Sequence, residues 1–504
     1  MSRNLVSVRS PSWAGSRHAS LALGASCALA ASITFTAPAR AGGFYVPEQG
    51  ARSVGMAGAS VAAPSEASGI FHNPASITGG PVLNAELDAL VVLPSFTFYR
   101  RPATDPYPQT PAGATVDFAP VKNTNHVAVV PFMGITSNLG VPDLGVGLGV
   151  YVPFGADLAF PTDGAQRNVV TKISLRAIHV TPTVAYRFWK RLSVGVGVSY
   201  IRSSFILEQR NASPFVLGNP NDFPNPQAST EGDTKIDATD SAALGANFGV
   251  LYTDPEDRFS LGASVMAPTR LDFRGTVDVT NRPESIVEMQ DAQGNLLPAG
   301  RRTDNVALSI PLPMILRAGA RVRPARQVAI ELDVNYQRWS TTREQKIVFE
   351  HNYPLLPQPG AQMNDIVLDQ SYRDTMTVRL GAEVTPLFES PLRVRAGVVF
   401  DQSPIDDRHF DLLTPDSDKL GVSVGAGYAV PVGPRATLGI DLSYMHLFFA
   451  ERNIGPRTIG TDANFKVEVP GSDRTILNKP APSFFYGVTR AAADLLSIGV
   501  SLRI

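Results

Sequence analysis

The sequence has very little cysteine and no long apolar run beyond its first forty residues. Its single cysteine, Cys27, lies in an N-terminal stretch that we interpret as a leader, so the mature chain can form neither a disulfide nor a thiolate metal site. No later segment has eighteen consecutive apolar residues, which excludes a membrane-spanning helix. A transmembrane β-barrel stays possible, because its strands alternate lipid-facing and lumen-facing residues and have moderate mean hydropathy.

An excess of charge of either sign is also absent. The chain has 44 Lys and Arg against 45 Asp and Glu, and nothing in this balance suggests a nucleic-acid partner. One acidic cluster could bind calcium, but its spacing follows no known calcium loop and favours a solvated loop. It comprises Asp406, Asp407, Asp411, Asp416 and Asp418. We therefore expect neither a metal nor a cofactor.

Residues 1–41 have the order of parts found in a secretory signal peptide. Basic residues, among them Arg3 and Arg17, precede an apolar stretch from Ala19 to Phe35. Ala39-Arg40-Ala41 then provides a small-x-small cleavage pattern before Gly42. The sequence thus predicts an exported protein whose mature chain begins near residue 42.

Strand periodicity is clear from Val82 onward. In residues 192–200, leucine, valine and tyrosine occupy every second position, and serine and glycine occupy the positions between them. Residues 420–430 and 438–444 repeat this pattern. One face of such a strand suits lipid, and the other suits a polar interior.

The whole chain gives about fourteen strands of this kind, joined alternately by short turns and long polar connections. The strands span 82–101, 123–139, 142–153, 171–190, 191–209, 236–253, 257–275, 302–323, 326–348, 370–387, 391–402, 418–431, 434–449 and 485–503. Outer-membrane barrels combine short periplasmic turns with long extracellular loops and an even number of strands. The sequence therefore predicts an all-β, 14-stranded antiparallel transmembrane β-barrel over residues 82–504. Trp189 and Trp339, at opposite predicted strand ends, would belong to its aromatic belts.

Residues 42–81 do not alternate and are rich in glycine, alanine and serine. A barrel of fourteen strands is too wide to fill with its own side chains, so we interpret this segment as a hatch that plugs the lumen. Charged residues predicted to face inward on the strands could pair with Glu48, Arg52 and Glu66 of this segment. They are Glu331, Asp333, Glu383, Arg393, Arg395, Asp441 and Arg503.

Several motifs in order resemble the FadL/TodX family of outer-membrane transporters for fatty acids and other hydrophobic compounds. Gly55-Met56-Ala57-Gly58-Ala59 followed by Asn73-Pro74-Ala75 is similar to the family's N-terminal hatch. Further matches include Pro153-Phe154-Gly155 and Arg338-Trp339-Ser340. The resemblance covers most of the mature chain and is weakest over residues 205–320 and 450–484. It implies a hatch inside fourteen strands, capture between extracellular loops, and sideways release through the barrel wall.

Sideways release requires an interrupted strand pairing. Pro153 has no N–H to donate, and Gly155 follows closely, so we expect a kink at Val152, Pro153, Phe154 and Gly155. The alternative is an ordinary strand end at Pro153. With the family resemblance, the hypothesis is that Asn73, Pro74 and Ala75 of the hatch gate this kink.

Two groups of residues are candidates for substrate binding. Phe215, Val216, Leu217 and Phe223 would line an extracellular capture groove. In the fourth strand the apolar parity changes near Ala177 and Ile178, as a β-bulge would cause, which would turn Lys172 and Arg176 inward toward a ligand headgroup. Solvated charges at a loop end are the alternative for this pair.

The predicted function is transport of hydrophobic small molecules, fatty acids or aromatic hydrocarbons, by a monomer embedded in outer-membrane lipid. A non-specific open porin is one alternative. A lipid hydrolase is another, because Gly421-Val422-Ser423-Val424-Gly425 matches the nucleophile-elbow pattern. That motif requires a strand–turn–helix context, whereas here it lies within a regular strand, so we interpret Ser423 as a lumen residue and expect no catalysis.

Overall fold

The structure is a computed structural model that describes residues 44–504, apart from 105–114, 126, 168, 213–230, 282–288, 291–295, 298–300, 351–365, 386–389, 408 and 456–485. All described residues belong to one compact unit, Arg40–Ile504. The predicted leader, residues 1–41, lies outside the described residues. No helix in the described part of the chain is long and apolar enough to cross a membrane.

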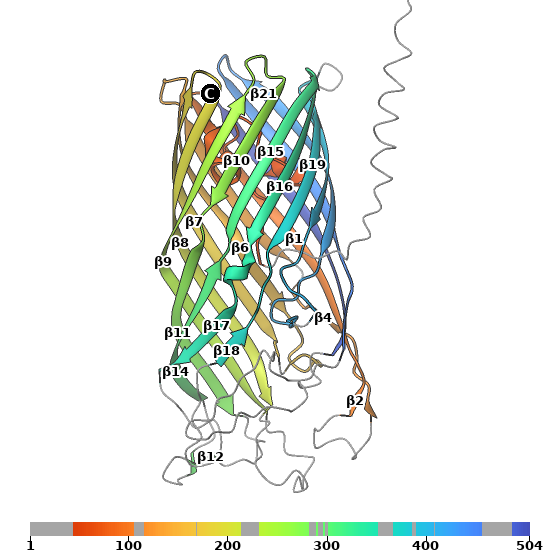
Figure 1. The fold of residues 1–504 in the computed structure, drawn as a ribbon. Coiled ribbons are helices and arrows are strands. Elements are labelled where there is room, and N and C mark those ends of the chain that lie inside the picture. Colours follow the sequence, from red (N-terminus) through yellow and green to blue (C-terminus); the bar gives the residue numbers. More distant parts are fainter. Residues whose placement is uncertain are drawn as a thin grey trace, which may run out of the picture. The chain divides into compact units, whose positions relative to one another are not determined.

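The described residues form a closed barrel of fourteen antiparallel strands, several of them in two pieces (Figure 1). In chain order they are β1 (Leu83–Arg100), β4 (Val121–Lys122) with β5 (Ala128–Ser137), β6 (Leu144–Ala159), β7 (Lys172–Phe188), β8 (Leu192–Ala212), β9 (Glu231–Thr253), β10 (Phe259–Met266) with β11 (Thr269–Asn281), β14 (Arg301–Leu312) with β15 (Met314–Ala325), β16 (Val328–Arg338) with β17 (Glu344–Phe349), β18 (Ile366–Asp369) with β19 (Thr375–Val384), β20 (Leu392–Asp401), β21 (Lys419–Val432), β22 (Ala436–Phe449) with β23 (Arg452–Ile454), and β24 (Gly487–Arg503). Pairing of β1 with β24 closes the barrel. The predicted fold is confirmed.

Two small hairpins lie outside the wall. They are β2 (Ala103–Thr104) with β3 (Thr115–Val116), and β12 (Met289–Gln290) with β13 (Leu296–Leu297). Short turns join strands at the end of the barrel that carries the C-terminus, and the long connections lie at the other end (Figure 1). Because outer-membrane barrels keep short turns in the periplasm, we call the first end periplasmic and the second extracellular.

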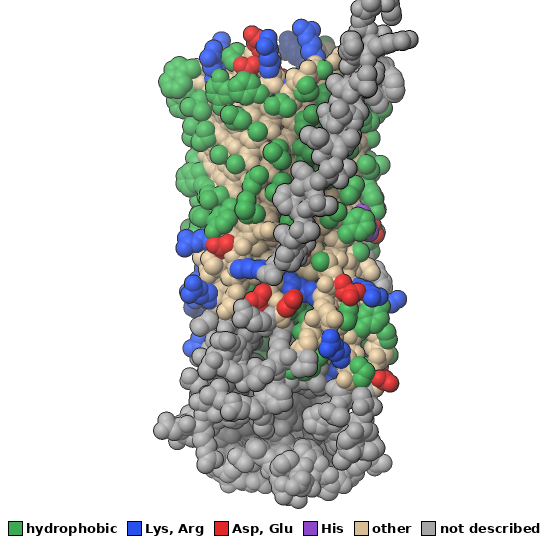
Figure 2. All heavy atoms as spheres, turned by 45° about the vertical axis from the view of Figure 1, so that its right-hand side comes forward, with side chains coloured by type: hydrophobic (Ala, Val, Ile, Leu, Met, Phe, Trp, Pro, Cys, Tyr) green, Lys and Arg blue, Asp and Glu red, His purple; other side chains and the backbone are tan. Residues whose placement is uncertain are grey.

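Apolar side chains form a band on the outer face of the barrel (Figure 2). Along β21, for example, Leu420, Val422 and Val424 are exposed, whereas Ser423 between them is buried. Charged side chains border this band on both sides (Figure 2). The alternation that predicted the strands therefore places apolar groups toward lipid, as the hydrophobic effect requires in a bilayer.

The hatch, described here over residues 44–81, fills the periplasmic half of the lumen. It contains two short α-helices, α2 (Ala51–Gly55) and α3 (Gly69–His72), and the 3-10 helix η2 (Pro74–Ile77). Nearly all of its residues are buried. Helix α2 packs against β21 and β22, and η2 packs against β7, β8 and β9. The N-terminal segment thus forms the predicted plug.

The lumen changes character along the barrel. On the inward face of β8 the residues nearest the periplasm are Ser193, Gly195 and Gly197. Further along the same face they are Ile201, Phe205 and Leu207, all buried in one large apolar cluster. Inward residues of β1, β7, β11 and β14 at the extracellular end join this cluster. The lumen is therefore polar around the hatch and apolar above it.

Candidate functional site

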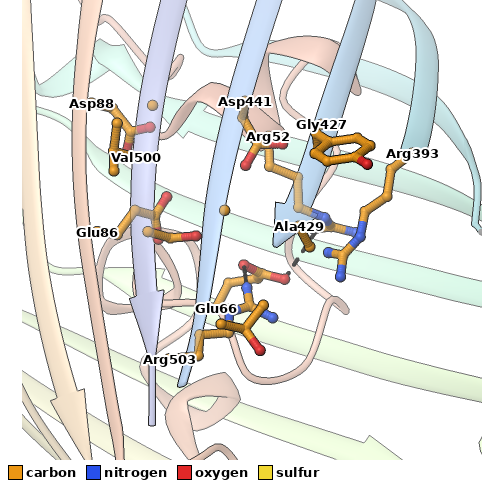
Figure 3. A pocket seen from close by; sticks show the side chains of 15 residues that line it. Arg52, Glu66, Glu86, Asp88, Arg393, Gly427, Ala429, Asp441, Val500 and Arg503 are labelled. Atoms are coloured by element: carbon orange, nitrogen blue, oxygen red, sulfur yellow. Dashed lines mark hydrogen bonds and ion pairs between the residues drawn. The ribbon is translucent and has the colours of Figure 1, made fainter. Parts of the chain in front are cut away.

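Ion pairs anchor the hatch to the barrel wall. The Arg52 guanidinium donates to both carboxylate oxygens of Glu383, at 3.0 and 3.1 Å. Glu383 also accepts from Arg395 at 2.7 Å, and Arg395 reaches Asp441 at 2.5 Å. Arg52, Asp441 and neighbouring charged groups line a small pocket in the periplasmic half of the barrel (Figure 3). Buried charges are tolerated when paired in this way, so the network fixes the position of the hatch.

The other two charged hatch residues also have partners on the wall. Glu48 accepts from both terminal nitrogens of Arg379, at 3.2 and 3.3 Å, and Glu66 accepts from Arg503 at 2.9 Å. The predicted pairing of Glu48, Arg52 and Glu66 with inward-facing wall charges is confirmed, although Arg379 was not among the predicted partners.

Wall carboxylates bind the hatch backbone as well. Asp333 accepts from the N–H groups of Ser60 and Val61, at 2.7 and 3.0 Å, and Glu331 accepts from Ala62 N–H at 2.7 Å. On the opposite side Asp88 accepts from Ala51 N–H at 3.1 Å. These bonds satisfy backbone donors of a segment that is not part of any sheet, which lets an irregular chain remain buried.

Burial and neighbouring charges together determine the protonation of two hatch residues. It lowers the pKa of the His72 imidazole to about 3, so this ring is neutral at physiological pH. Its Nε2 lies 2.9 Å from the Gln49 carbonyl oxygen. Burial alone would raise the pKa of Glu66, but the positive charges of Arg503 and Arg52 outweigh it and lower that pKa. The hatch therefore holds one neutral imidazole and one ionised carboxylate.

The Asn73-Pro74-Ala75 motif is fixed by hydrogen bonds and by two glycines. The Asn73 side chain accepts from Ala75 N–H at 3.1 Å, and donates to the carbonyls of Val61 at 2.9 Å and Val250 at 3.0 Å. A Cβ at Gly249 would lie 2.0 Å from Asn73 Oδ1, and one at Gly195 would lie 2.5 Å from the Pro74 carbonyl carbon. Only glycine allows the motif to approach β8 and β9 this closely.

The pairing of strand β6 is irregular at the residues where the sequence predicts a kink. Pairing with β7 shifts register between Tyr151 and Phe154, and pairing with β5 ends at Tyr151. The extra residue belongs to a β-bulge at Val152 and Pro153, where the proline has no N–H to donate.

The start of the hatch pairs with this kink. Val46 N–H donates to the Pro153 carbonyl at 2.8 Å, and Gly155 N–H donates to the Phe44 carbonyl at 2.9 Å. Tyr45 and Phe154 form an isolated antiparallel bridge, and their ring centroids are 5.3 Å apart. Backbone groups released by the interrupted wall pairing thus find partners on the hatch, as burial at membrane depth requires.

Asn73-Pro74-Ala75 therefore lies against β8 and β9, and residues 44–49 occupy the kink. A chain of contacts still links the two. His72, which precedes the motif, binds the Gln49 carbonyl, and the Gln49 side chain donates to the Val152 carbonyl at 3.2 Å. The motif is thus connected to the kink through His72 and Gln49.

The predicted cationic headgroup site does not form. Alternation along β7 is unbroken, Arg176 is exposed on the outer face and Lys172 is only half-buried. The bulge that we expected in β7 lies in β6, because Pro153 lacks the N–H that regular pairing needs. The inward orientation expected for this pair is thus wrong. The predicted groove residues Phe215, Val216, Leu217 and Phe223 lie outside the described residues.

Two lumen residues were not found from the sequence. Arg317 of β15 is buried and donates to the Phe71 carbonyl at 3.3 Å and the Tyr45 hydroxyl at 2.8 Å, both uncharged groups. His179 of β7 is buried beside Tyr151 and Phe154, and neither ring nitrogen has a hydrogen-bond partner. The sequence does show that a charged or imidazole side chain lies on the inward face of each of these two strands. That pattern cannot distinguish a residue that contacts a ligand from one that pairs with another residue of the barrel.

The alternative sites have structural explanations. Ser423 lies within β21 and its hydroxyl donates to the Gly55 carbonyl at 3.1 Å, so it anchors the hatch. Asp416 accepts from the Ser403 hydroxyl and from Lys419, and Asp418 accepts from Ser403 N–H. Across the described ranges, no group of three or more His, Cys, Asp or Glu side chains is placed to hold a metal ion.

A family model described as outer membrane protein transport protein (OMPP1/FadL/TodX) matches residues 31–476. A long-chain fatty acid transport protein of Escherichia coli O6:H1 is 25% identical over 340 residues, which are 65% of this chain and 72% of that protein.

Two solved structures have the same fold. The crystal structure of a Pseudomonas aeruginosa FadL homologue superimposes with a TM-score of 0.71, at 18% identity, over 91% of this chain and 99% of that chain. The Pseudomonas putida toluene transporter TodX superimposes with a TM-score of 0.58, at 16% identity, over 91% of this chain and 98% of that chain.

Proposed function

The chain belongs to the outer membrane protein transport protein family (OMPP1/FadL/TodX), and on this premise we propose that it carries hydrophobic small molecules across the outer membrane. The observation that carries the proposal is the apolar extracellular half of the lumen, which ends at the hatch. Long-chain fatty acids and aromatic hydrocarbons are the substrate classes named for similar proteins.

Desolvation explains why such a lumen suits this cargo. Burying one methylene is worth about 0.8 kcal/mol, so a sixteen-carbon chain gains on the order of 12 kcal/mol by leaving water. Phe205, Leu207 and Phe273 belong to the surface that would receive it. Release into the periplasm would forfeit most of this gain, whereas release sideways into lipid would keep it.

The kink at Val152–Gly155 is the proposed exit. Its backbone groups are bound by the start of the hatch rather than by β5. Withdrawal of residues 44–46 would leave the wall open there, because no strand ladder would have to break. The Asn73-Pro74-Ala75 motif would control this step through His72 and Gln49.

Arg317 is the candidate partner for a carboxylate headgroup, in place of Lys172 and Arg176. It is a buried cation whose hydrogen-bond partners at the kink side of the lumen, Tyr45 and the Phe71 carbonyl, carry no charge. A fatty-acid carboxylate would supply the missing counter-charge. An aromatic hydrocarbon would gain nothing from it.

The protein would act as a monomer without catalysis. Extracellular capture by Phe215, Val216, Leu217 and Phe223 remains part of the proposal. The open-porin alternative is disfavoured by the buried hatch, since a lumen filled by residues held through Arg52, Glu48 and Glu66 leaves no wide aqueous channel. Large, steady ionic conductance of the purified protein in a planar bilayer would support the porin instead.

An uptake assay tests the proposal. Cells that lack their own transporter of this class would express the chain and receive labelled hexadecanoate or toluene. Expression should raise uptake of at least one probe above that of cells without the chain. If hexadecanoate is carried, Arg317→Gln should reduce its uptake about tenfold and leave toluene uptake unchanged. Uptake of neither probe would contradict the proposed function.

A further inference from the structure

The seam between β9 and the seventh strand of the barrel is interrupted. Pairing of β9 with β10 ends at Asn247 and Met266, and pairing of β9 with β11 resumes only at Thr239 and Arg274. Every residue between these pairs is described, and the structure gives no ladder pair among them. A single backbone bond, from Ala267 N–H to the Ala246 carbonyl at 2.8 Å, lies at the edge of the interruption.

Local irregularities on both strands cause this interruption. Pro268 separates β10 from β11 and cannot donate to β9. On β9, the register with β8 shifts between Ala243 and Asp240, which marks a bulge at the same level. The interruption is thus a feature of both strands and not the frayed end of one.

The seam lies in line with the kink of β6. Cross-strand partners run from Tyr151 to His179, then to Ile201, and then to Ala243 at the seam. Leu244 is 70% exposed on the outer surface, whereas Asp240 and Asp272 mark the more polar end of the seam. The seam therefore crosses the extracellular edge of the apolar band.

A cavity lies directly inside the seam. Its lining includes Gly245, Asn247 and Met266 from the seam, together with Phe154 of the kink and His179. It measures about 10 Å³, room for about one water molecule, so the passage is closed in this conformation.

Two buried polar groups in this lining have no partner. The two ring nitrogens of His179 make no hydrogen bond, and the amide oxygen Oδ1 of Asn247 makes none either. A neutral imidazole offers one donor and one acceptor, and the amide oxygen offers a second acceptor. Buried polar atoms are normally satisfied, so the lining suits a small group that both accepts and donates, such as a hydroxyl or a carboxylic acid.

A side chain bridges the seam at its extracellular end. The Asp240 carboxylate accepts from Ala242 N–H at 3.1 Å and, across the seam, from Asp272 N–H at 2.8 Å. The Thr269 hydroxyl adds a second side-chain bond across the seam, to the Leu244 carbonyl at 3.3 Å. Two side chains and one backbone bond thus hold together strands that elsewhere are held by a continuous ladder. Such bonds can be released without the unzipping of a strand pair.

We infer that this seam is a second lateral opening of the barrel, through which amphipathic molecules with a hydroxyl or carboxylic acid headgroup pass between the cavity and the outer leaflet. The inference rests on the proposed function, because it requires a hydrophobic cargo in the lumen. The headgroup binds His179 and Asn247 while the tail crosses the seam. Opening requires the Asp240 bridge to part and the bulged segments to separate.

Reversible cross-linking tests this opening. Because the only cysteine of the chain lies in the predicted leader, Ala242→Cys with Asp272→Cys would be the only reactive pair. A bifunctional methanethiosulfonate reagent then ties the seam, and dithiothreitol releases it. Val250→Cys with Ala263→Cys is the matched control, since these exposed residues pair directly on the same two strands.

The cross-linked seam should lower hexadecanoate uptake by about a quarter, because the kink remains open and carries most of the cargo. Uptake should recover on reduction, and the cross-linked control should change it by less than about a tenth. Unchanged uptake when mass spectrometry shows complete cross-linking would overturn the inference and leave the proposed function intact. Absence of uptake by the unmodified chain would overturn both.

A photoreactive diazirine analogue of hexadecanoic acid gives a second readout. Labelling should reach residues 245–247 and 266–269 in addition to the kink. Labelling confined to residues 152–155 would contradict a second opening.

Discussion

At the residue scale, glycines determine how the hatch meets the wall. The inward faces of β8 and β9 carry Gly195 and Gly249 where Pro74 and Asn73 approach, so the strand alternation that predicts the barrel also provides the space for the motif. Inward glycines in a strand have little else to contribute, because they weaken strands and pack no side chain.

Gly249→Ala should loosen the hatch without disturbing the barrel. The new methyl group would displace the Asn73 side chain and cost its bonds to Val61 and Val250, a loss of about 1 to 3 kcal/mol in hatch docking. Hydrogen–deuterium exchange should show faster exchange over residues 59–77. Gly455→Ala, with open space around its Cβ, is the control. Equal protection in the two variants would show that the close approach does not hold the motif.

His72 makes hatch docking sensitive to acid. Its pKa is about 3 in the docked hatch and ordinarily 6.5, so an undocked hatch binds a proton that the docked one excludes. Docking is therefore fully favoured above pH 6.5 and weakens by about 1.4 kcal/mol for each pH unit below it, down to about pH 3.

Hatch protection factors should accordingly fall between about pH 7 and pH 5, a range in which carboxylates of ordinary pKa remain ionised. His72→Gln, which cannot take up a proton, should show a smaller fall in hatch protection than the unchanged chain over this range. A flat profile in the unchanged chain would refute the assigned burial of this ring.

For some single residues, the side of the barrel wall that they face could not be predicted from the sequence. Trp339 was expected in an aromatic belt, but it is 0% exposed and packs on Phe44 and Tyr372, whereas Trp189 is 81% exposed as expected. Both lie at strand ends, and the sequence does not say which side of the wall an end residue faces. The orientation of Arg176 was predicted wrongly for a related reason. A change in the apolar alternation was assigned to a bulge in β7, whereas the bulge lies in the neighbouring strand β6.

At the element scale, β6 contains a bulge and pairs there with the start of the hatch instead of with β5. The kink was predictable because Pro153 and Gly155 are local signals of interrupted pairing. Its partner was not, because residues 44–49 carry no periodicity that assigns them to a wall strand. The apolar extracellular half of the lumen was not predicted either. Alternation in β8 indicates which residues face lipid, but it does not require the opposite face to be polar, and there the inward residues are Ile201, Phe205 and Leu207.

Pro153→Ala should tighten the exit. An alanine supplies the N–H that regular pairing needs, which favours a straight β6 and leaves residues 44–46 without a place in the wall. Uptake of the transported probe should fall several-fold while the heat resistance of the folded barrel on denaturing gels is kept. Pro182→Ala on the exposed face of β7 is the matched control. Normal uptake by Pro153→Ala would exclude the kink as the exit.

At the scale of the whole molecule, the barrel separates two tasks along its axis. The periplasmic half binds the hatch through ion pairs and carboxylate–backbone bonds, and the extracellular half presents an apolar surface. A hatch fixed on one side by Arg52 and Glu383 can remain docked while its first residues move. The molecule would therefore pass its cargo sideways without opening a path for ions.

The most direct test of this account ties the start of the hatch to the kink. Tyr45 and Phe154 form an antiparallel bridge, so Tyr45→Cys with Phe154→Cys places two thiols opposite each other in a chain whose one natural cysteine, Cys27, lies in the predicted leader. The account predicts strongly reduced uptake of the transported probe in the oxidised variant and recovery after reduction. Equal uptake in the oxidised and reduced states, with the disulfide verified by mass spectrometry, would contradict sideways release at this kink.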